Sequence, residues 1–381
     1  MASNTRTTYP GIDKEKQKTA KEYFFRKYFT GKISAIVSLT AIITLCLTGL
    51  SLIISSFAFS ITSIQLFARS LYFIILFSFF FLISFPFSYI SSFSIEHRYD
   101  FSNQDLAGWL KDQFKAFAIS LLLGLIIVNT FYFIVDISPH LWWLWTGIFL
   151  MLFTVLLQHL APVLFIPVFY KLEPLSDEIL KEKLLSLAEK TGINVIDIHT
   201  IKLSDKTKKA NAALTGLGST RRILLGDTLL KDYDYGEIET VIAHELAHHI
   251  HGHISKLILL DGIITFAGAY ILYLILPRSL ILIGLPSLEN IASLPGIMLV
   301  SGILSFIISP VGPHIRRKME TEADRTAIEL SRKPDKFIST MVKFANNYLS
   351  FAYPPKIIEW LEYDHPPIGK RISSAEKMLD I

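Results

Sequence analysis

The stretch TVIAHELAHHIHGH, residues 240–253, contains the pattern His-Glu-x-x-His at His244, Glu245 and His248. Residues four apart on a helix share one face, so both imidazoles can reach one zinc ion. Glu245 lies beside them, placed to accept a proton from water, and zinc lowers the pKa of a bound water to near 7. The spacing therefore predicts a hydrolytic site with one zinc ion per chain, against the alternative of a histidine-rich helix end at a membrane surface.

Three further histidines follow the motif, namely His249, His251 and His253. A straight helix rises about 10 Å between His244 and His251, too far for these two residues to share one zinc ion. We therefore expect the three additional histidines to be solvated or to support the ligands, rather than to bind the metal themselves.

A catalytic zinc site needs a third protein ligand and an open position. The later segment RRKMETEADRTAIEL offers Glu320 and Glu322 as candidates. Asp324 follows Glu320 by four residues and so shares its helix face, and a carboxylate beside a ligand histidine can fix the tautomer of that histidine. Glu320 as ligand with Asp324 behind it is the preferred pair, although the spacing alone fits an ordinary solvated acidic face equally well.

The composition indicates what kind of protein must position these residues. Hydrophobic residues make up 51% of the 381 positions, charged residues only 18%, and the mean hydropathy is +0.44. This predicts an integral membrane protein with soluble portions. The single cysteine, Cys46, excludes an intrachain disulfide. We expect no nucleic-acid partner, because the net charge is only +4 and there is no zinc-finger spacing or basic-aromatic array.

Six apolar segments are long enough to cross a bilayer. They run approximately over residues 33–60, 65–92, 114–136, 141–169, 256–277 and 295–312. Lysine and arginine are frequent in the preceding tail, residues 1–32, and absent from the turn at 137–140. The positive-inside rule then places the amino terminus in the cytoplasm. An even number of spans puts the polar region 170–255 and the tail 313–381 on that same side.

The polar region has its own helix and strand signals. SDEILKEKLLSLAEKTG predicts a helix with Ser176 as N-cap and Gly192 just past its end. NVIDIHTIKLS and RRILLGDTLL are typical of strands. Asp234 and Glu237 predict the start of the helix that carries the zinc motif. The expected fold is thus a mainly α-helical multi-pass membrane protein, with four spans in 33–169, two in 256–312, and an inserted α+β zinc protease region at 170–255.

Several segments, in the right order, resemble the type I CAAX prenyl proteases, which are integral-membrane zinc endopeptidases of the gluzincin type. They are the early loop FPFSYISSFSIEHRYDFSNQDLAGWLKDQFK, the membrane exit APVLFIPVFYKLEPL, and the segments NAALTGLGSTRRILLGDTLL, HELAHHIHGH, RRKMETEAD and DHPPIGKRI. The likeness covers about residues 84–372. Two features depart from the family: its members typically have seven spans, and some carry an acidic insertion that is absent here.

The resemblance implies roles for further residues. It assigns Glu320 as the third ligand, and it implies that His365 points into the site and steadies the developing oxyanion. It places Asn211 and Ala212 on an edge strand that pairs with an extended substrate. Arg371 would bind either a substrate carboxylate or an acidic neighbour.

The leading hypothesis is a membrane zinc endopeptidase that cleaves peptide bonds next to the lipid bilayer, in CAAX-type carboxyl-terminal peptides that carry a prenyl group, with Glu245 as general base. Its active site would face the cytoplasm, in an inner membrane or an endoplasmic reticulum membrane depending on the organism. The alternatives are a quality-control protease for membrane proteins, a transporter, and a zinc-bound scaffold without activity.

Overall fold

The computed structural model describes residues 9–216 and 221–379. Within these residues, six helical segments are long and apolar enough to cross a membrane. They are α1 (Lys14–Leu47), α3 with its continuation (Gln65–Ser88, extended through η1 and α4 to Arg98), α5 (Leu106–Ile137), α6 with its continuation (Trp142–Leu160, extended through η2 and α7 to Phe169), α11 (His253–Leu282), and η4 with α12 (Ile291–Ser293 and Leu294–Ile308). The predicted multi-pass helical architecture with six spans is confirmed.

The first predicted span, 33–60, is wrong as a single segment. The chain breaks at Gly49, whose φ of +72° is a left-handed conformation that glycine adopts readily. The following helix α2 (Leu50–Ile61) has 12 residues, so it extends about 18 Å and falls short of a hydrocarbon core of about 30 Å. The crossing is made by α1, which begins well before residue 33.

In the basic tail, residues 1–32, the part from Lys14 onward is the beginning of helix α1; residues 1–8 lie outside the described range. Asp13 caps the start of α1 by accepting hydrogen bonds from two backbone N–H groups. Gln17 Nε2 donates to the backbone carbonyls of Ala345 and Ser350, at 3.3 and 3.2 Å. Tyr23 is buried. The start of α1 therefore belongs structurally with the carboxyl-terminal part of the chain.

The polar region folds around a four-stranded sheet in the order β1-β2-β4-β3. Its strands are β1 (Leu172–Pro174), β2 (Asp197–Ile201), β3 (Ala212–Thr215) and β4 (Arg222–Gly226). β2 and β4 run parallel, whereas the outer pairs are antiparallel. Within the described part of the chain, no strand pairs with the second edge of β3, which we call its free edge. Helices α8 (Glu178–Glu189) and α10 (Tyr235–Ile250) share one apolar core with this sheet. That core fixes the helix on which the zinc motif lies.

The local predictions for this region hold with shifts at their ends. The N-cap of α8 is Asp177 and not Ser176, because Asp177 accepts the hydrogen bond from the third residue on, Leu180. The segment RRILLGDTLL is a strand only to Gly226 and then turns into α9 (Asp227–Asp232). The start of α10 is confirmed, with a reciprocal capping box between Asp234 and Glu237.

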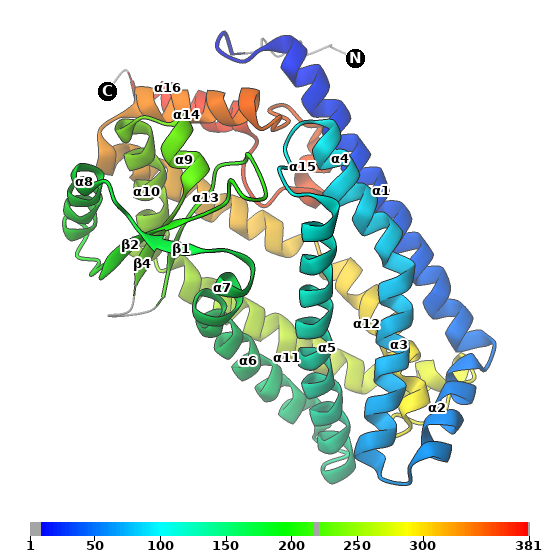
Figure 1. The fold of residues 1–381 in the computed structure, drawn as a ribbon. Helices are drawn as coiled ribbons and strands as arrows, with labels where there is room; N and C mark the ends of the chain where they lie inside the picture. Colours follow the sequence, from blue (N-terminus) through cyan, green and yellow to red (C-terminus); the bar gives the residue numbers. More distant parts are fainter. Residues whose placement is uncertain (1–8, 217–220, 380–381) are drawn as a thin grey trace, which may run out of the picture.

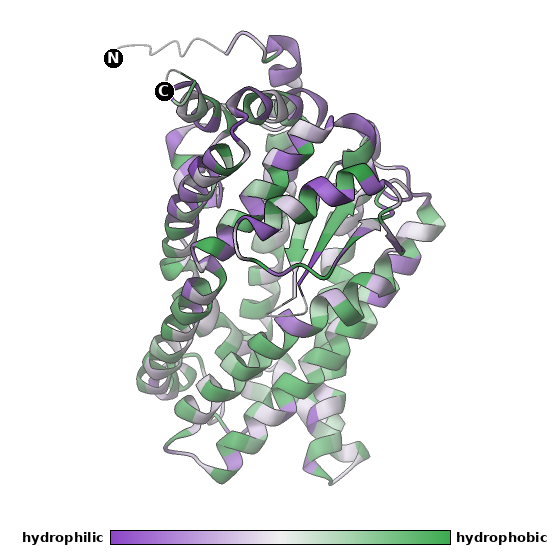
Figure 2. Cartoon of the chain, turned by 90° about the vertical axis from the view of Figure 1, so that its left-hand side faces the viewer, coloured by the Kyte–Doolittle hydropathy of each residue, from purple (hydrophilic) through white to green (hydrophobic). Residues whose placement is uncertain are grey.

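Four helices complete the chain after the last span: α13 (Val311–Ser331), α14 (Pro334–Asn347), α15 (Lys356–Glu362) and α16 (Ile368–Glu376). They gather with the start of α1 and the α+β region at one end of the long helices (Figure 1). Hydrophobic residues dominate the other part of those helices, while hydrophilic residues concentrate toward the α+β end (Figure 2). The start of α1, the α+β region and the helices after the last span therefore lie together at one end of the long helices (Figure 1).

Candidate metal centre

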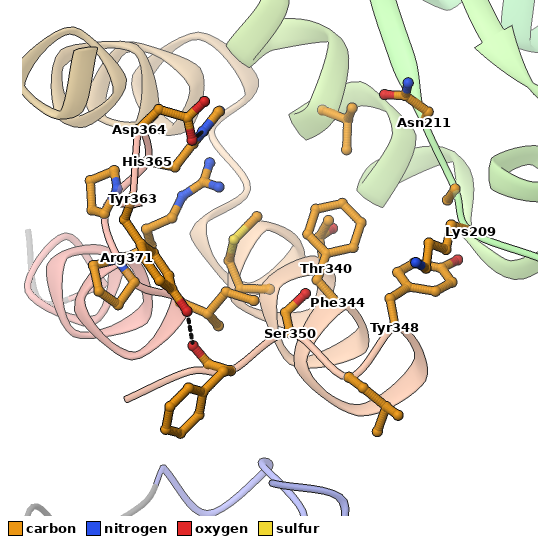
Figure 3. Close-up of a pocket in the computed structure, with 18 of the residues that line it drawn as sticks. Lys209, Asn211, Thr340, Phe344, Tyr348, Ser350, Tyr363, Asp364, His365 and Arg371 are labelled. Atoms are coloured by element: carbon orange, nitrogen blue, oxygen red, sulfur yellow. Dashed lines mark hydrogen bonds and ion pairs between the residues drawn. The ribbon is translucent and has the colours of Figure 1, made fainter. Parts of the chain in front are cut away.

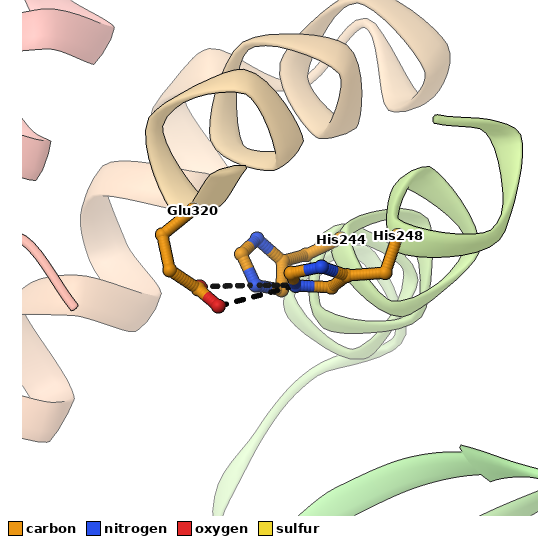
Figure 4. A group of neighbouring side chains, drawn as sticks. All are labelled: His244, His248 and Glu320. Carbon is orange, nitrogen blue, oxygen red and sulfur yellow. Dashed lines mark hydrogen bonds and ion pairs between the residues drawn. The ribbon is translucent and has the colours of Figure 1, made fainter. Parts of the chain in front are cut away.

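Two helices bring three ligand-type side chains together. His244 and His248 lie one turn apart on α10, with their Nε2 atoms 3.1 Å from each other. α13 packs along α10 and brings Glu320 to the same point (Figure 4). Glu320 Oε2 lies 3.1 Å from His244 Nε2, and Oε1 lies 3.4 Å from His248 Nε2. The three residues that spacing and resemblance selected therefore converge.

The spacing of these atoms suits a zinc ion. Ligand atoms on a tetrahedron with arms of about 2.0–2.1 Å lie about 3.3 Å from one another, and the observed separations are 3.1 to 3.4 Å. Among the described residues, the buried Glu320 Oε2 has no hydrogen-bond partner. Two imidazole nitrogens and one carboxylate are also the donor types that zinc prefers. The residues present fit the metal.

His244 is backed by a buried ion pair. Its Nδ1 lies 2.9 Å from Asp324 Oδ1, and Arg371 donates from Nε and Nη2 to the two oxygens of Asp324, at 2.8 and 2.5 Å. Burial opposes ionisation of Asp324, yet Arg371 and His244 together hold its pKa well below the usual range. Burial likewise disfavours a charged His244, but Asp324 and Glu320 raise its pKa to about 9. The strongly negative surroundings favour a cation here.

Arg371 was expected to bind either a substrate carboxylate or an acidic neighbour. In the structure its guanidinium engages the acidic neighbour, Asp324, through two hydrogen bonds. Its side chain is 11% exposed and also lines the pocket described below.

His248 has a different support, which is one of the three histidines that follow the motif. Its Nδ1 lies 2.9 Å from Nδ1 of His253, whose Nε2 lies 3.1 Å from Glu322 Oε2. His253 is only 1% exposed. Glu322 thus faces away from the metal position but reaches the histidines, since His251 Nδ1 also lies 3.3 Å from it. Burial, with the neighbouring His244, lowers the pKa of His248 to about 4, which keeps its imidazole neutral.

The remaining predicted residues line one pocket of about 840 Å³ that also contains His244. Glu245 is partly buried, and burial raises the pKa of its carboxyl group. His365 is half exposed, with Nε2 3.2 Å from Glu320 Oε2 and Nδ1 2.7 Å from Asp364. Figure 3 shows His365 and Arg371 on one side of this pocket and Asn211 on the other.

Asn211 and Ala212 lie at the beginning of the sheet edge. Ala212 is the first residue of β3, and the carbonyl of Asn211 accepts a hydrogen bond of 2.8 Å from the Gly226 N–H. Both therefore lie where β3 enters the pocket, next to the free edge of the sheet.

Comparison with known families matches nearly the whole chain. Residues 6–171 match the CAAX prenyl protease N-terminal domain, described as five membrane helices, and residues 174–379 match peptidase family M48. The chain belongs to peptidase family M48. Within the first match, α2 supplies a fifth apolar helix beside the four that are long enough to span. Family membership supports a membrane metalloprotease over the transporter and scaffold alternatives.

Individual M48 relatives are similar to this chain. The uncharacterized metalloprotease YhfN of Bacillus subtilis is 30% identical over 283 residues, which is 73% of this chain and 66% of YhfN. The human CAAX prenyl protease 1 homolog is 23% identical over 328 residues, 74% of this chain and 68% of the relative. The chain thus spans about two thirds of the length of these relatives. The crystal structure of S. mikatae Ste24p superposes with a TM-score of 0.86 at 23% identity, covering 96% of this chain and 90% of that one, and therefore shares the fold.

Proposed function

We propose that this M48 protein is a zinc endopeptidase that cleaves peptide bonds beside the membrane, in carboxyl-terminal peptides whose cysteine carries a prenyl group. The observation that carries the proposal is the convergence of two histidines and a glutamate at zinc spacing, with Glu245 in the same pocket. The names of the human and yeast relatives, CAAX prenyl protease 1, support the substrate class.

His244, His248 and Glu320 would hold one zinc ion per chain. Zinc, when bound, supplies a Lewis acid that polarises a peptide carbonyl and acidifies water. Asp324 Oδ1 lies 2.9 Å from His244 Nδ1, so its carboxylate would favour a proton on Nδ1 and leave the lone pair of Nε2 free for the metal. His253 does the same for His248 at a distance of 2.9 Å. Both ligand histidines would thus be held in one tautomer.

Glu245 is the proposed general base. Its raised pKa makes the carboxylate a better proton acceptor than an ordinary glutamate, so it can take the proton of the attacking water. The same carboxyl group then passes that proton to the leaving amine. His365 faces the metal position from the other side and is half exposed, which suits a donor to the oxyanion that forms on the substrate.

Substrate binding would use the free edge of β3. Asn211 and Ala212 offer backbone groups with which an extended peptide can pair, which gives grip with little side-chain selectivity. The pocket is also lined by aromatic residues of α1, including Phe24 and Tyr28. A peptide with one lipid-soluble group could therefore be bound where the polar region meets the membrane helices.

Metal analysis tests the ligand set. The purified protein should contain about one zinc ion per chain, and Glu320→Ala should lose it because one of three ligands is gone. Glu322→Ala is the matched control, two residues away on the same helix, and should keep its zinc. The opposite pattern would show that the wrong carboxylate has been assigned.

Cleavage of matched peptides tests the activity. Purified protein should cut a peptide with S-farnesylcysteine after that residue, and should cut the unprenylated peptide more slowly, with products mapped by mass spectrometry. Equal cleavage of both peptides would support a general membrane protease instead, and cleavage of neither would contradict the proposed substrate class.

We also propose that the active site faces the cytoplasm, of an inner membrane or an endoplasmic reticulum membrane. Single cysteines can be placed at the exposed positions Lys14, Lys190, Ser374 and Ser63 in a Cys46→Ala background. The first three should react with an impermeant reagent from the cytoplasmic side, and Ser63→Cys only from the other side. Labelling of Lys14→Cys and Ser374→Cys from opposite sides would overturn this topology.

A further inference from the structure

A second charged cluster lies at the far end of the pocket from His365. It consists of Lys27, Lys209 and Tyr23, which line the pocket, and Glu96 behind them. Figure 3 shows Lys209 beside Tyr348, across the pocket from His365 and Arg371. None of the roles assigned above uses these residues.

The cluster carries more positive than negative charge. Lys27 Nζ lies 2.5 Å and Lys209 Nζ 2.8 Å from the two oxygens of Glu96, and the Tyr23 hydroxyl donates to the same carboxylate at 2.6 Å. One carboxylate therefore serves two ammonium groups. Two other acidic residues that line the pocket are already paired, Glu362 with Lys32 and Asp364 with His365, both at 2.7 Å. The excess charge leaves this end of the pocket suited to an anion.

Lys209 is held firmly in this position. Its Nζ lies 4.6 Å from the centre of the Phe101 ring and 5.0 Å from that of Tyr23, within cation–π distance. Its backbone carbonyl accepts a hydrogen bond of 2.9 Å from Thr228 Oγ1. Burial lowers the pKa of Lys209 against the opposing effect of Glu96, so its ammonium group gains from an additional anionic partner. The side chain is nevertheless 33% exposed and can be reached.

The direction in which a peptide would pair with β3 determines which part of the substrate lies beside this cluster. A peptide that adds to the free edge of β3 is expected to run antiparallel to it, because antiparallel pairing is the more stable arrangement. Its carboxyl-terminal part then lies beside the residues that precede β3. Lys209 precedes Asn211 by two residues, or about 7 Å of extended chain. The lysines therefore lie beside the portion of the substrate that follows the scissile bond.

We propose that Lys27 and Lys209 bind the free α-carboxylate of the substrate, roughly two to three residues past the scissile bond. The inference rests on the proposed peptidase function and assigns two side chains of the pocket to recognition of the substrate's carboxyl end. A peptide whose carboxyl end is amidated, or extended by several residues, places no carboxylate at this position and should bind more weakly.

Binding to the Glu245→Gln variant tests this without turnover. The probe is a fluorescent peptide that ends in S-farnesylcysteine and three aliphatic residues, made as the free acid and as the amide. Fluorescence anisotropy should show that the free-acid peptide binds roughly tenfold more tightly than the amide. This is the difference expected when a carboxylate forms charge-assisted hydrogen bonds with the lysines. Adding Lys209→Gln or Lys27→Gln should remove the preference, and Lys209→Arg should restore most of it.

Lys208→Gln is the matched control, since Lys208 neighbours Lys209 but pairs with Asp100 outside the pocket. It should leave the preference for the acid intact. Equal binding of acid and amide, binding of neither, or a preference that survives both glutamine variants would each overturn the inference. Cleavage of acid and amide at one rate by the native protein would refute the carboxylate site while leaving the peptidase proposal standing.

Discussion

The two histidines of the candidate metal centre are supported in different ways. Behind His244 stands a carboxylate, Asp324, that is itself neutralised by a buried arginine. Behind His248 stands another histidine, His253, which reaches a carboxylate that is about half exposed, Glu322. Removing one support should therefore change the stability of the protein and its zinc affinity in different proportions from removing the other.

The supports also belong to different parts of the molecule. The first connects α10 with α13 and α16, all in the polar end of the chain. The second depends on His253, the first residue of the membrane helix α11, which follows Gly252 in a left-handed conformation (φ +61°). One support thus ties the metal position to the folded polar core, and the other ties it to a membrane span.

The largest effect on stability should come from Asp324→Asn. The variant leaves the guanidinium of Arg371 buried without its partner, which typically costs roughly 3–5 kcal/mol. Thermal unfolding in detergent should show a clear loss, whereas Glu329→Gln, an exposed position on the same helix, should change little. If Asp324→Asn unfolds at the same temperature as the native protein, the ion pair behind His244 does not stabilise the fold.

An intermediate effect, on metal affinity rather than on stability, is expected from His253→Ala. Loss of a hydrogen-bond partner behind a ligand histidine typically weakens metal binding 10–100-fold. Competition with a zinc chelator measures this affinity. His249→Ala is the control, because among the described residues the His249 side chain forms no hydrogen bond with His248. Unchanged zinc affinity in His253→Ala would show that His253 does not support His248.

The smallest effect should come from Glu322→Gln. Glu322 is 48% exposed, its pairing with His253 is screened by solvent, and an amide can still accept a hydrogen bond. We expect a change in zinc affinity of a few-fold at most, and little change in unfolding temperature. A loss as large as that of His253→Ala would show that the carboxylate, and not the second imidazole, controls His248.

The same contrast explains how far the sequence could predict the site. His244, Glu245 and His248 follow helix spacing, and the capping box at Asp234 marks where that helix begins, so these are local signals. Glu320 was favoured because Asp324 shares its face. His253 was expected either to support the ligands or to be solvated, as were His249 and His251. Helix spacing could not single it out, because α10 ends at Ile250 and the spacing no longer applies five residues after His248.

In the membrane region, too, part of the structure could not be predicted from the sequence. Hydropathy is continuous across residues 33–60, so a window of apolar residues does not reveal the turn at Gly49. The helix over residues 14–32 is stabilised by contacts with residues more than 300 positions away, such as Gln17 with Ser350. No local pattern encodes those contacts. The presence of six helices long and apolar enough to span a membrane depends only on length and composition, and the sequence predicted it.

In the proposed mechanism, Glu245 moves protons beside a metal that it does not bind. Glu245→Gln tests it most directly, because glutamine is nearly isosteric but cannot accept the proton of the attacking water. Zinc content and cleavage of the prenylated peptide should be measured on the same preparation. We expect one zinc ion per chain and a loss of cleavage of about 10²–10⁴-fold or more. Cleavage at the native rate, or loss of the zinc ion, would contradict it.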